Sequence, residues 1–257
     1  MSLSNRTKAL TIRLLRPTVF YPVHMGQYLR EKYFLRHLRK LPPASFCEVL
    51  DAGCGLGTYS RKLAMTYPNM KVTAIDIKEF AGWHESPSNV QFKQQDLIQL
   101  SEERRYDFCL CIEVLEHIPG NRRALENIFR SLKPGGYFYL HMPDDKHDRR
   151  ILPEKLFRQF DEWAQDEHIG EQYTLEQMKA LLKSIGFTVV ETHNTFGFWG
   201  KLAWELDRIT DSRRGLKVLL MPVLKGFAYF DMWFPKSTGA ICVLGQKPRL
   251  TEIMQMS

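Results

Sequence analysis

The stretch VLDAGCGLG, residues 49–57, places an apolar run, an acid and three alternating glycines in immediate succession. A strand that ends in Gly-x-Gly lets the backbone turn sharply and approach a ligand where a side chain would block it. The helix expected after the glycines offers backbone N–H groups that have no partner within the helix. The stretch therefore predicts a ligand-binding turn at the carboxyl end of a buried strand.

The spacing of these glycines separates two kinds of nucleotide site. A dinucleotide-binding turn has the pattern Gly-x-Gly-x-x-Gly, but here Thr58 stands where the third glycine of that pattern would be. An acid at the strand end repels a pyrophosphate and suits a cationic ligand. The turn therefore favours a nucleoside with a positively charged, amino-acid-like tail, such as S-adenosylmethionine. The residues expected to border this ligand are Asp51, Gly53, Cys54, Gly55 and Gly57.

Composition limits the class of protein. A chain of 257 residues with 44% hydrophobic residues is long enough for one α/β domain with additions. The net charge of +7 is spread along the chain, which favours a solvated basic surface over nucleic-acid binding. The five cysteines are odd in number, and Cys109 and Cys111 fall on one face of an apolar strand pattern, as reduced core thiols of a cytoplasmic protein do. We see no secretory leader and no spanning segment.

Alternating strand and helix patterns follow a basic N-terminal extension, which carries a helical pattern within residues 24–40. This alternation predicts a parallel sheet with helices on both faces. Strands are expected at 47–52, 71–76, 90–94, 106–112, 136–142, 187–193 and 239–245, and helices at 58–67, 121–132 and 174–185. The expected organisation is an extension over 1–44, a core over 45–193 with 239–248, and an insertion over 194–238.

Two interruptions of the alternation, residues 143–173 and 194–238, are too long for simple connections. Both leave from the carboxyl end of a strand, where doubly wound sheets bind ligands, so both are expected to roof the site. The second is rich in aromatic residues. A small satellite core packed on the main domain is the favoured interpretation of this composition, and an apolar acceptor pocket, a dimer interface and a membrane-facing surface remain alternatives. The oligomeric state stays open.

Acids also follow the second and third strands. Asp76, next to Ile77, lies twenty-five residues after Asp51, where a carboxylate of such a sheet accepts hydrogen bonds from ribose hydroxyls. Asp96 provides an acceptor for the amino group of adenine, and Leu97 provides an apolar neighbour for the ring. An N-cap role is the alternative for Asp96.

The ordered motifs LDAGCGLG, AIDI, QQDL, CIEVLEHI and LKPGG resemble those of the class I S-adenosylmethionine-dependent methyltransferases, especially small-molecule enzymes of the "type 11" kind. The resemblance covers roughly residues 45–190. It implies a Rossmann-like, mostly parallel sheet of seven strands whose last strand is antiparallel. It also implies that the glycines and Asp51 hold the methionyl part of the cofactor, Asp76 the ribose, and Asp96 with Leu97 the adenine.

The segment EVLEH, residues 113–117, ends the fourth strand beside the expected position of the reactive methyl group. Glu113 is assigned to the cofactor side, while Glu116 and His117 are catalytic candidates, His117 as the base that removes an acceptor proton. Equal weight goes to a structural role, in which His117 packs at a helix start and Glu116 caps or solvates that turn. His168 is a further catalytic candidate, and His168 and Tyr173, just before a helix capped by Thr174, are expected to line the acceptor pocket.

The same segment raises the question of a metal. Its Glu-x-x-Glu-His spacing places three ligands on one face of a helical turn, with His168 as a fourth, and resembles the metal site of plant small-RNA 3′-end methyltransferases. The aromatic-acid-Trp-Thr pattern found after the second histidine in those enzymes is missing from this chain. We therefore expect no metal.

These features predict an S-adenosylmethionine-dependent methyltransferase that acts on an O or N nucleophile of a small-molecule or lipid-like acceptor and releases S-adenosylhomocysteine. Two other functions are kept open. One is a scaffold or sensor that binds the cofactor without catalysis. The other is RNA methylation, which the lack of an RNA-binding module and of an Asn-Pro-Pro-Tyr type motif makes unlikely. The expected location is cytoplasmic, and peripheral contact with a membrane is the alternative left open.

Overall fold

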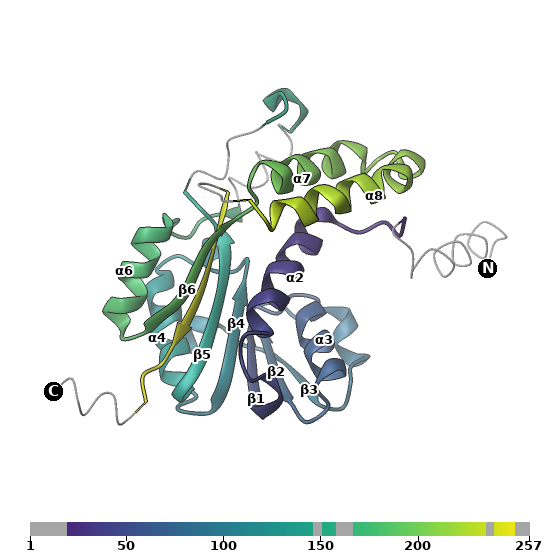
Figure 1. Ribbon diagram of the computed structural model, residues 1–257. Helices are drawn as coiled ribbons and strands as arrows, with labels where there is room; N and C mark the ends of the chain where they lie inside the picture. Colours follow the sequence, from purple (N-terminus) through teal and green to yellow (C-terminus); the bar gives the residue numbers. More distant parts are fainter. Residues whose placement is uncertain (1–19, 146–150, 158–166, 235–238, 250–257) are drawn as a thin grey trace.

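A seven-stranded sheet forms the centre of the molecule (Figure 1). The computed structural model describes residues 20–145, 151–157, 167–234 and 239–249, and orders the strands β3-β2-β1-β4-β5-β7-β6. The fold class predicted from the sequence is confirmed, and residues 1–19 of the predicted extension lie outside the described residues. The strands are β1 Glu48–Ala52, β2 Lys71–Asp76, β3 Val90–Gln94, β4 Tyr106–Ile112, β5 Leu132–Pro143, β6 Thr188–Thr195 and β7 Ala240–Gln246.

The last strand runs against its neighbours. β7 pairs antiparallel with β5 on one side and with β6 on the other, whereas β1 to β5 pair in parallel. Because β6 and β7 are antiparallel, the insertion that joins them begins and ends at the same end of the sheet. The strand predicted at 136–142 begins earlier than expected, at Leu132, and a register shift near Tyr106 accommodates Gly135 with a φ of 82°.

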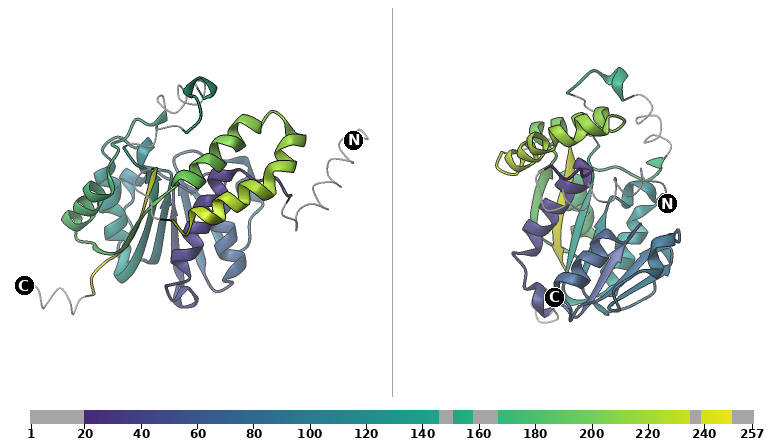
Figure 2. Two further views of the ribbon diagram at one scale, coloured as in Figure 1. Left: turned by 45° about the horizontal axis from the view of Figure 1, so that its top comes forward. Right: turned by 90° about the vertical axis from the view of Figure 1, so that its right-hand side faces the viewer.

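Helices cover both faces of the sheet (Figure 2). On one face, α4 (Asn121–Ser131) and α6 (Leu175–Ile185) bury their apolar sides in the main core. On the other, α2 (Met25–Leu38) and α3 (Thr58–Thr66) pack against β1, β2 and β4. The capping box predicted at the start of α6 is present, because the Thr174 hydroxyl accepts from the Gln177 N–H and the Gln177 side chain accepts from the Thr174 N–H.

The insertion folds as a helical hairpin, α7 (Phe198–Thr210) and α8 (Arg214–Asp231), above the carboxyl ends of the parallel strands. It packs on the N-terminal half of α2 and forms the satellite core that the sequence favoured. Two buried acids fix the hairpin to α2: an Asp207 carboxylate oxygen accepts from the Met25 N–H at 3.0 Å, and Asp231 accepts from the Tyr33 hydroxyl at 2.7 Å. Buried members of this core are Met25, Leu29, Tyr33, Ala203, Met221, Leu224 and Ala228.

Helix α2 thus belongs to two cores, since Phe34 and Leu38 pack on the sheet and Met25 and Leu29 pack under the hairpin. The division of the chain into extension, core and insertion stays a prediction. Among the described residues, no helix combines the length and the apolar character needed to cross a membrane.

Candidate active site

The glycine turn after β1 has the backbone that its sequence predicts. Gly53 and Gly57 have φ values of 78° and 76°, in the left-handed region that side chains rarely adopt. A Cβ at Gly53 would lie 2.3 Å from a methyl group of Val114, and one at Gly57 would lie 2.3 Å from the ring of Phe92. Space around the middle glycine, Gly55, is open, since no atom lies within 4 Å of where its Cβ would be. The turn is therefore closed toward the protein at its ends and open at its centre.

Asp76 stands beside this open centre. One of its carboxylate oxygens accepts from the Gly55 N–H at 2.8 Å and the other from the Lys78 N–H at 3.1 Å, while Ile77 is exposed next to it. The other side of the turn is held by Trp83, whose indole N–H donates to the Gly55 carbonyl at 2.9 Å. Trp83 is 7% exposed, and the sequence analysis did not identify it.

Asp51 lies beneath the turn rather than on it. Its side chain is 3% exposed and accepts a hydrogen bond from the Ser60 hydroxyl of α3. Burial raises the pKa of Asp51 to about 7, because a charged carboxylate loses its hydration there. Asp51, the acid predicted to face a cationic tail, is thus only partly ionised near pH 7 before any ligand is present.

At the end of β3, the side chain of Asp96 caps a short 3-10 turn, η3 (Leu97–Gln99), by accepting from the Ile98 N–H at 2.9 Å. This is the N-cap geometry kept as an alternative to adenine binding. Leu97 is 4% exposed and packs into the main core. The structure therefore does not bring the Leu97 side chain to a surface where it would cover a ring.

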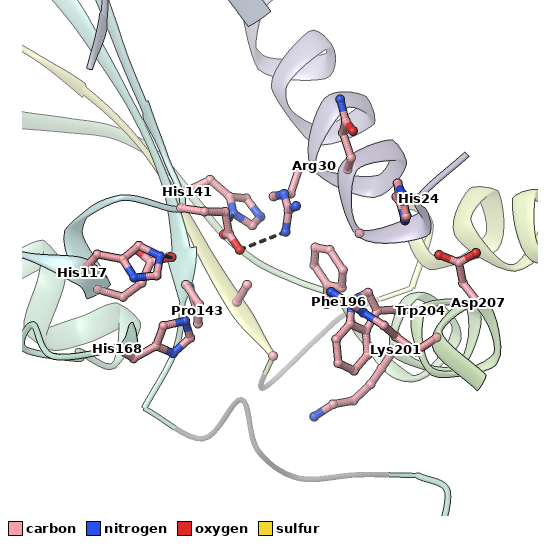
Figure 3. A pocket seen from close by; sticks show the side chains of 17 residues that line it. His24, Arg30, His117, His141, Pro143, His168, Phe196, Lys201, Trp204 and Asp207 are labelled. Carbon is pink, nitrogen blue, oxygen red and sulfur yellow. Dashed lines mark hydrogen bonds and ion pairs between the residues drawn. The ribbon is translucent and has the colours of Figure 1, made fainter. Parts of the chain in front are cut away.

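A cavity of about 460 Å³ opens between the carboxyl end of the sheet, α2 and α7. Figure 3 shows His117 and His168 on one side of it and Phe196, Lys201 and Trp204 on the other. One wall is thus rich in titratable groups and the opposite wall carries two aromatic rings. The described lining consists of His24, Gly26, Gln27, Arg30, Glu113, Glu116, His117, His141, Pro143, His168, Phe196, Lys201, Trp204, Asp207, Arg208, Gly239 and Ala240.

Glu113 is the link between the glycine turn and this cavity, since its neighbour Val114 packs against Gly53. Its two carboxylate oxygens pair with Arg30 of α2 and with the Nδ1 atom of His141 of β5, each at 2.9 Å. Burial alone would raise the pKa of Glu113, but Arg30 and His141 outweigh it and lower the pKa to about 2. The network continues from His141 Nε2 to the Thr195 hydroxyl at 2.9 Å.

Two cavity residues have strained backbones. Glu113 and Phe196 have φ values of 56° and 55°, although neither is glycine. Such a conformation costs on the order of 1–2 kcal/mol and persists only where the surroundings impose it. Strain of this kind gathers at functional sites, which supports a functional role for the cavity.

Glu116, His117 and His168 form the titratable wall. Glu116 is 1% exposed, its pKa is raised well above the usual range by burial and by the charge of Glu113, and its Oε2 has no hydrogen-bond partner among the described residues. His117 Nδ1 lies 2.8 Å from the carbonyl oxygen of Glu167. Because a carbonyl only accepts, Nδ1 carries the proton and Nε2 keeps its lone pair. The centroids of the His117 and His168 rings lie 5.1 Å apart.

The described part of the first interruption is fastened to this wall. The Gly170 N–H donates to the Glu116 carbonyl at 2.8 Å, and a Cβ at Gly170 would come within 2.5 Å of a backbone oxygen. The Tyr173 hydroxyl donates to the Asn121 side chain at 2.8 Å. His168 is part of the described lining of the cavity and Tyr173 is not, and the acceptor-pocket role of both stays a prediction.

The structure also bears on metal binding. One ligand atom each from Glu116, His117 and His168 lies within 4.8 Å of the others. These are three of the four ligands considered from the sequence. The fourth, Glu113, instead forms hydrogen bonds with Arg30 and His141. The expectation of a metal-free site stays a prediction.

Sequence reasoning did not identify the residues that α2 and β5 contribute, notably Arg30 and His141. Trp204 and Phe196 belong to the aromatic set within 194–238, for which an acceptor pocket was one of the alternatives. His141 carried a usable signal, because it is the one imidazole within the apolar strand run 137–142. Arg30 carried none, since its partner Glu113 is 83 residues away in the sequence.

The comparisons with known proteins agree with this geometry. Residues 25–192 match the family model described as a methyltransferase domain. The chain belongs to the methyltransferase family. Ubiquinone biosynthesis O-methyltransferases are similar to it. The enzyme of Rickettsia akari (strain Hartford) is 34% identical over 119 residues, which are 43% of this chain and 44% of the relative. The enzyme of Pseudomonas fluorescens (strain Pf0-1) is 38% identical over 100 residues, which are 36% of this chain and 42% of the relative. The chain matches less than half of the length of these two relatives.

Solved structures share the fold. Phosphoethanolamine N-methyltransferase 2 of Haemonchus contortus, solved with S-adenosyl-L-methionine, superposes with a TM-score of 0.62 at 22% identity, over 85% of this chain and 53% of that one. A putative sarcosine dimethylglycine methyltransferase of Galdieria sulphuraria gives a TM-score of 0.54 at 17% identity, over 86% and 84%. At these identities the similarity concerns the fold alone.

Proposed function

We propose that this methyltransferase transfers the methyl group of S-adenosylmethionine to an oxygen nucleophile of a small, partly apolar acceptor, with S-adenosylhomocysteine as the product. One observation carries the proposal. The glycine turn, open at Gly55, adjoins through Val114 and Glu113 a cavity whose wall holds the imidazole of His117, with Nδ1 bonded to the Glu167 carbonyl and Nε2 4.0 Å from Glu116 Oε1. A donor seat and a base thus border the same space.

The residues of the turn fit the donor. The open side of Gly55 admits a ligand close to the backbone, and Asp76 stands next to it as the acceptor for ribose hydroxyls. A bound cation stabilises the charged form of a nearby carboxylate, so the ammonium of the methionyl tail would lower the pKa of Asp51 from its raised value near 7. Bound there, the cofactor supplies an electrophilic methyl group on a sulfonium.

The chemistry needs alignment and the removal of one proton. The acceptor oxygen forms a bond to the methyl carbon while the carbon–sulfur bond breaks, and the electron pair of that bond neutralises the sulfonium. The acceptor proton passes to Nε2 of His117, whose Nδ1–H is held by the Glu167 carbonyl. Glu116, kept neutral by burial, is placed to donate a hydrogen bond to a second oxygen of the acceptor.

The acceptor class follows from the opposite wall. Phe196 and Trp204 offer flat apolar surfaces, while Lys201 and Arg208 add positive charge at the cavity. A hydroxylated aromatic ring with an apolar substituent or an acidic group suits these walls. The names of the ubiquinone biosynthesis relatives support O-methylation of an acceptor of this class.

Turnover tests the proposal directly. With S-adenosylmethionine and an alkyl-substituted catechol as probes, we expect formation of S-adenosylhomocysteine and of the methyl ether. His117→Gln should lower kcat by about 10²–10³ at unchanged donor affinity, since a general base contributes about this much. His84→Gln, at an exposed position outside the cavity, is the matched control and should keep full activity.

The alternatives give different results. A scaffold or sensor would bind the donor without turnover of any acceptor. An RNA methyltransferase would bind RNA with an affinity that falls steeply with salt and would transfer methyl groups to it. Either result would replace the small-molecule proposal.

We also propose that the enzyme contacts an anionic phospholipid surface through α8 and the residues after it. Tyr229, Phe230 and Trp233 are exposed at 62%, 55% and 72%, an unusual density of aromatic surface. A groove next to Tyr229 carries Lys32 and Arg36 of α2 and Arg39, which follows that helix. Aromatic rings beside cationic side chains are the composition that binds at the interface of an anionic bilayer. The groove residues are Tyr28, Lys32, Leu35, Arg36, Arg39, Tyr229 and Met232.

Sedimentation with vesicles tests this contact. The protein should sediment with vesicles that contain anionic lipid, and the double variant Phe230→Ser with Trp233→Ser should remain in the supernatant. Met65→Ser, which removes an equally exposed apolar side chain from α3, is the control. Equal sedimentation of all three proteins would contradict the proposal. A cytoplasmic location is also proposed, and it is supported by the five cysteines, all of which are free thiols.

A further inference from the structure

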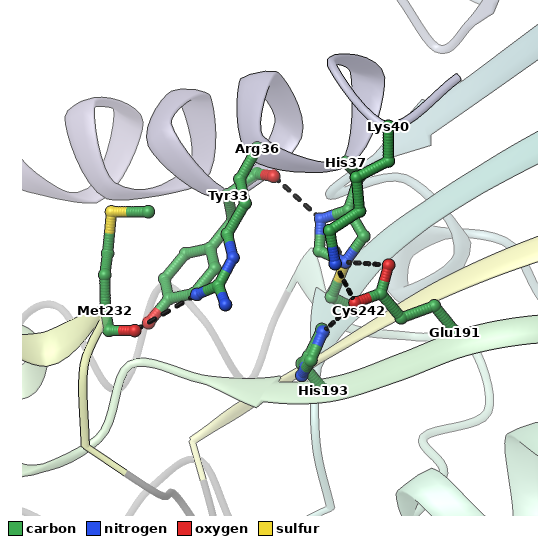
Figure 4. A network of polar contacts seen from close by, with 8 residues as sticks. All are labelled: Tyr33, Arg36, His37, Lys40, Glu191, His193, Met232 and Cys242. Atoms are coloured by element: carbon green, nitrogen blue, oxygen red, sulfur yellow. Dashed lines mark hydrogen bonds and ion pairs between the residues drawn. The ribbon is translucent and has the colours of Figure 1, made fainter.

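A second cluster of histidine and carboxylate groups lies away from the cavity, where α2 packs on the edge of the sheet (Figure 4). His37 of α2 and Glu191 and His193 of β6 each place one ligand atom within 4.8 Å of the others. None of these residues lines the cavity of the proposed active site.

The positions follow from the pleat of the sheet. Glu191 and His193 are two residues apart on β6 and therefore point to the same face. His193 pairs in register with Cys242 of β7, whose Sγ lies 3.9 Å from His37 Nε2 and forms the floor of the cluster. On this face α2 presents His37, which is 1% exposed. Three strand residues and one helix residue thus converge on one point.

The protonation of His37 is fixed by its neighbour. Its Nδ1 atom lies 2.8 Å from the backbone carbonyl of Tyr33, which can only accept, so Nδ1 carries the proton. Nε2 of the neutral ring then keeps a lone pair, and Glu191 Oε2 and Cys242 Sγ each lie 3.9 Å from it. An imidazole held by a backbone carbonyl through its other nitrogen is the usual outer-shell arrangement of a metal ligand.

We infer that His37, Glu191 and His193 form a binding site for a divalent cation of the zinc class, with water from the exposed side of His193 as the fourth ligand. Two imidazoles and one carboxylate suit Zn²⁺ in both ligand type and number. Ligand atoms around tetrahedral zinc are about 3.3 Å apart. His193 Nε2 and Glu191 Oε1 are hydrogen-bonded at 2.6 Å, a contact that a bound metal would replace. This distance and the 3.9 Å noted above bracket the spacing expected around zinc.

Lys40 is the group with which a metal competes. Its ammonium bonds to Glu191 and forms an ion pair there, so the site already attracts a cation. The Lys40 side chain is 47% exposed and can turn into solvent, which would leave the carboxylate to a metal. The occupied site would fasten α2 to β6. Because α2 also carries Arg30, the partner of Glu113, metal binding would hold one wall of the cavity in place.

The experiment measures zinc binding by the full chain. The cavity cluster is removed first by His117→Ala and His168→Ala, so that bound zinc reports on the second cluster alone. In this background we expect one equivalent of zinc and a higher melting temperature in its presence. Glu191→Gln and His193→Ala, both at partly exposed positions, should weaken zinc binding at least tenfold. His84→Ala is the matched control and should leave the affinity unchanged.

Lys40→Met separates the metal site from a purely structural ion pair. If the carboxylate of Glu191 binds zinc, removal of the competing ammonium should tighten binding several-fold. If the cluster is an ion-pair network only, no stoichiometric zinc is bound in the background lacking the cavity cluster. That result overturns the inference, as does zinc binding that is indifferent to Glu191→Gln and His193→Ala, or that fails to tighten in Lys40→Met. The readout is the metal affinity itself, so it is independent of whether the enzyme methylates the acceptor proposed above.

Discussion

The glycine turn and the cavity beside it are built in opposite ways. The turn uses residues 51–97, which are near one another in the sequence, and its contacts run mostly through backbone atoms, such as the Gly55 N–H and carbonyl. The cavity draws on residues from His24 to Ala240, and its contacts run through side chains, such as the pairing of Arg30 and His141 with Glu113.

This difference has a consequence for specificity. A site made of backbone conformation tolerates little change, because a side chain at Gly53 or Gly57 would meet atoms at 2.3 Å. A site made of side chains on separate elements can be altered one residue at a time. The same donor seat can therefore serve different acceptors, and the two sides should respond independently to substitution.

The largest effect is expected at the turn. Gly53→Ala combines a positive φ with a methyl group that would lie 2.3 Å from Val114, so we expect a loss of stability of about 3 kcal/mol and donor binding too weak to measure. Thermal denaturation and donor titration measure both.

Gly120→Ala is the matched control, because Gly120 has a φ of 66° with open space around its Cβ position. It should lose only about 1–2 kcal/mol and bind the donor normally. A further variant, Gly53→Ala with Val114→Ala, should recover part of the stability. Equal losses in Gly53→Ala and Gly120→Ala would mean that the contact with Val114 is unimportant.

The second prediction concerns pH and Asp51. Its pKa is about 7 in the folded chain against 3.8 in the unfolded one, so the folded state holds the proton longer and stability from this group falls as pH rises from about 4 to 7. Asp51→Asn removes the titration. We expect the stability of this variant relative to the wild type to rise by about 2 kcal/mol between pH 5 and pH 7. Denaturant unfolding at both pH values measures it.

Saturating donor should flatten this pH dependence in the wild type, since a cationic tail favours the charged carboxylate. An unchanged slope with donor present would place the ammonium away from Asp51 and remove that residue from the donor site.

What could be foreseen from the sequence follows the same division. The glycine turn and the capping box at Thr174 depend on residues close in sequence, and their patterns predicted them. The antiparallel last strand was implied by the family resemblance, and the order of the strands, which pairs segments far apart in the chain, was not predicted. The start of β5 at Leu132 was predicted four residues too late, at 136. The glycines of the LKPGG segment were interpreted as the end of a helix, and in the sequence a glycine within an irregular strand gives the same signal.

The cavity could not be assembled in this way. The hairpin α7–α8 was expected to be a satellite core on the strength of its aromatic residues, yet that core is mostly aliphatic and several of the aromatics are exposed. Which face of a helix is buried depends on what it packs against, here the N-terminal half of α2. That partner precedes the hairpin by about 170 residues, and no local pattern encodes the pairing.

The third prediction tests the charge network of the cavity. Arg30→Met leaves Glu113 with His141 alone, and we expect a loss of about 1–2 kcal/mol at pH 7 because both partners are only about three-quarters buried. The pKa of Glu113 is about 2 when folded against 4.5 unfolded, so its contribution is complete above pH 4.5 and is lost toward pH 2. The stability gap between wild type and variant should therefore shrink between pH 5 and pH 3. Donor affinity should stay within a few-fold of the wild type; a large loss would show that the cavity and the turn are coupled through Glu113.

The smallest effects are expected from substitutions of two tryptophans, Trp83 at the glycine turn and Trp204 in the cavity wall. Trp83→Phe keeps the ring that stacks on Phe92 but removes the hydrogen bond to the Gly55 carbonyl. The loss of one such bond lowers the free energy of unfolding by about 1 kcal/mol, and the less firmly held turn should bind the donor at most about five-fold more weakly. The acceptor KM should not change.

Trp204→Phe should change acceptor binding and not donor binding, because Trp204 lines the cavity, whereas the glycines of the turn do not. A smaller ring there should raise the acceptor KM a few-fold and leave the donor affinity unchanged. Isothermal titration for the donor and initial rates for the acceptor separate the two constants. If each tryptophan shifts its own constant, donor and acceptor are bound by independent parts of the protein. If Trp204→Phe also weakens donor binding, the hairpin contributes to both, and the acceptor wall is part of the donor seat.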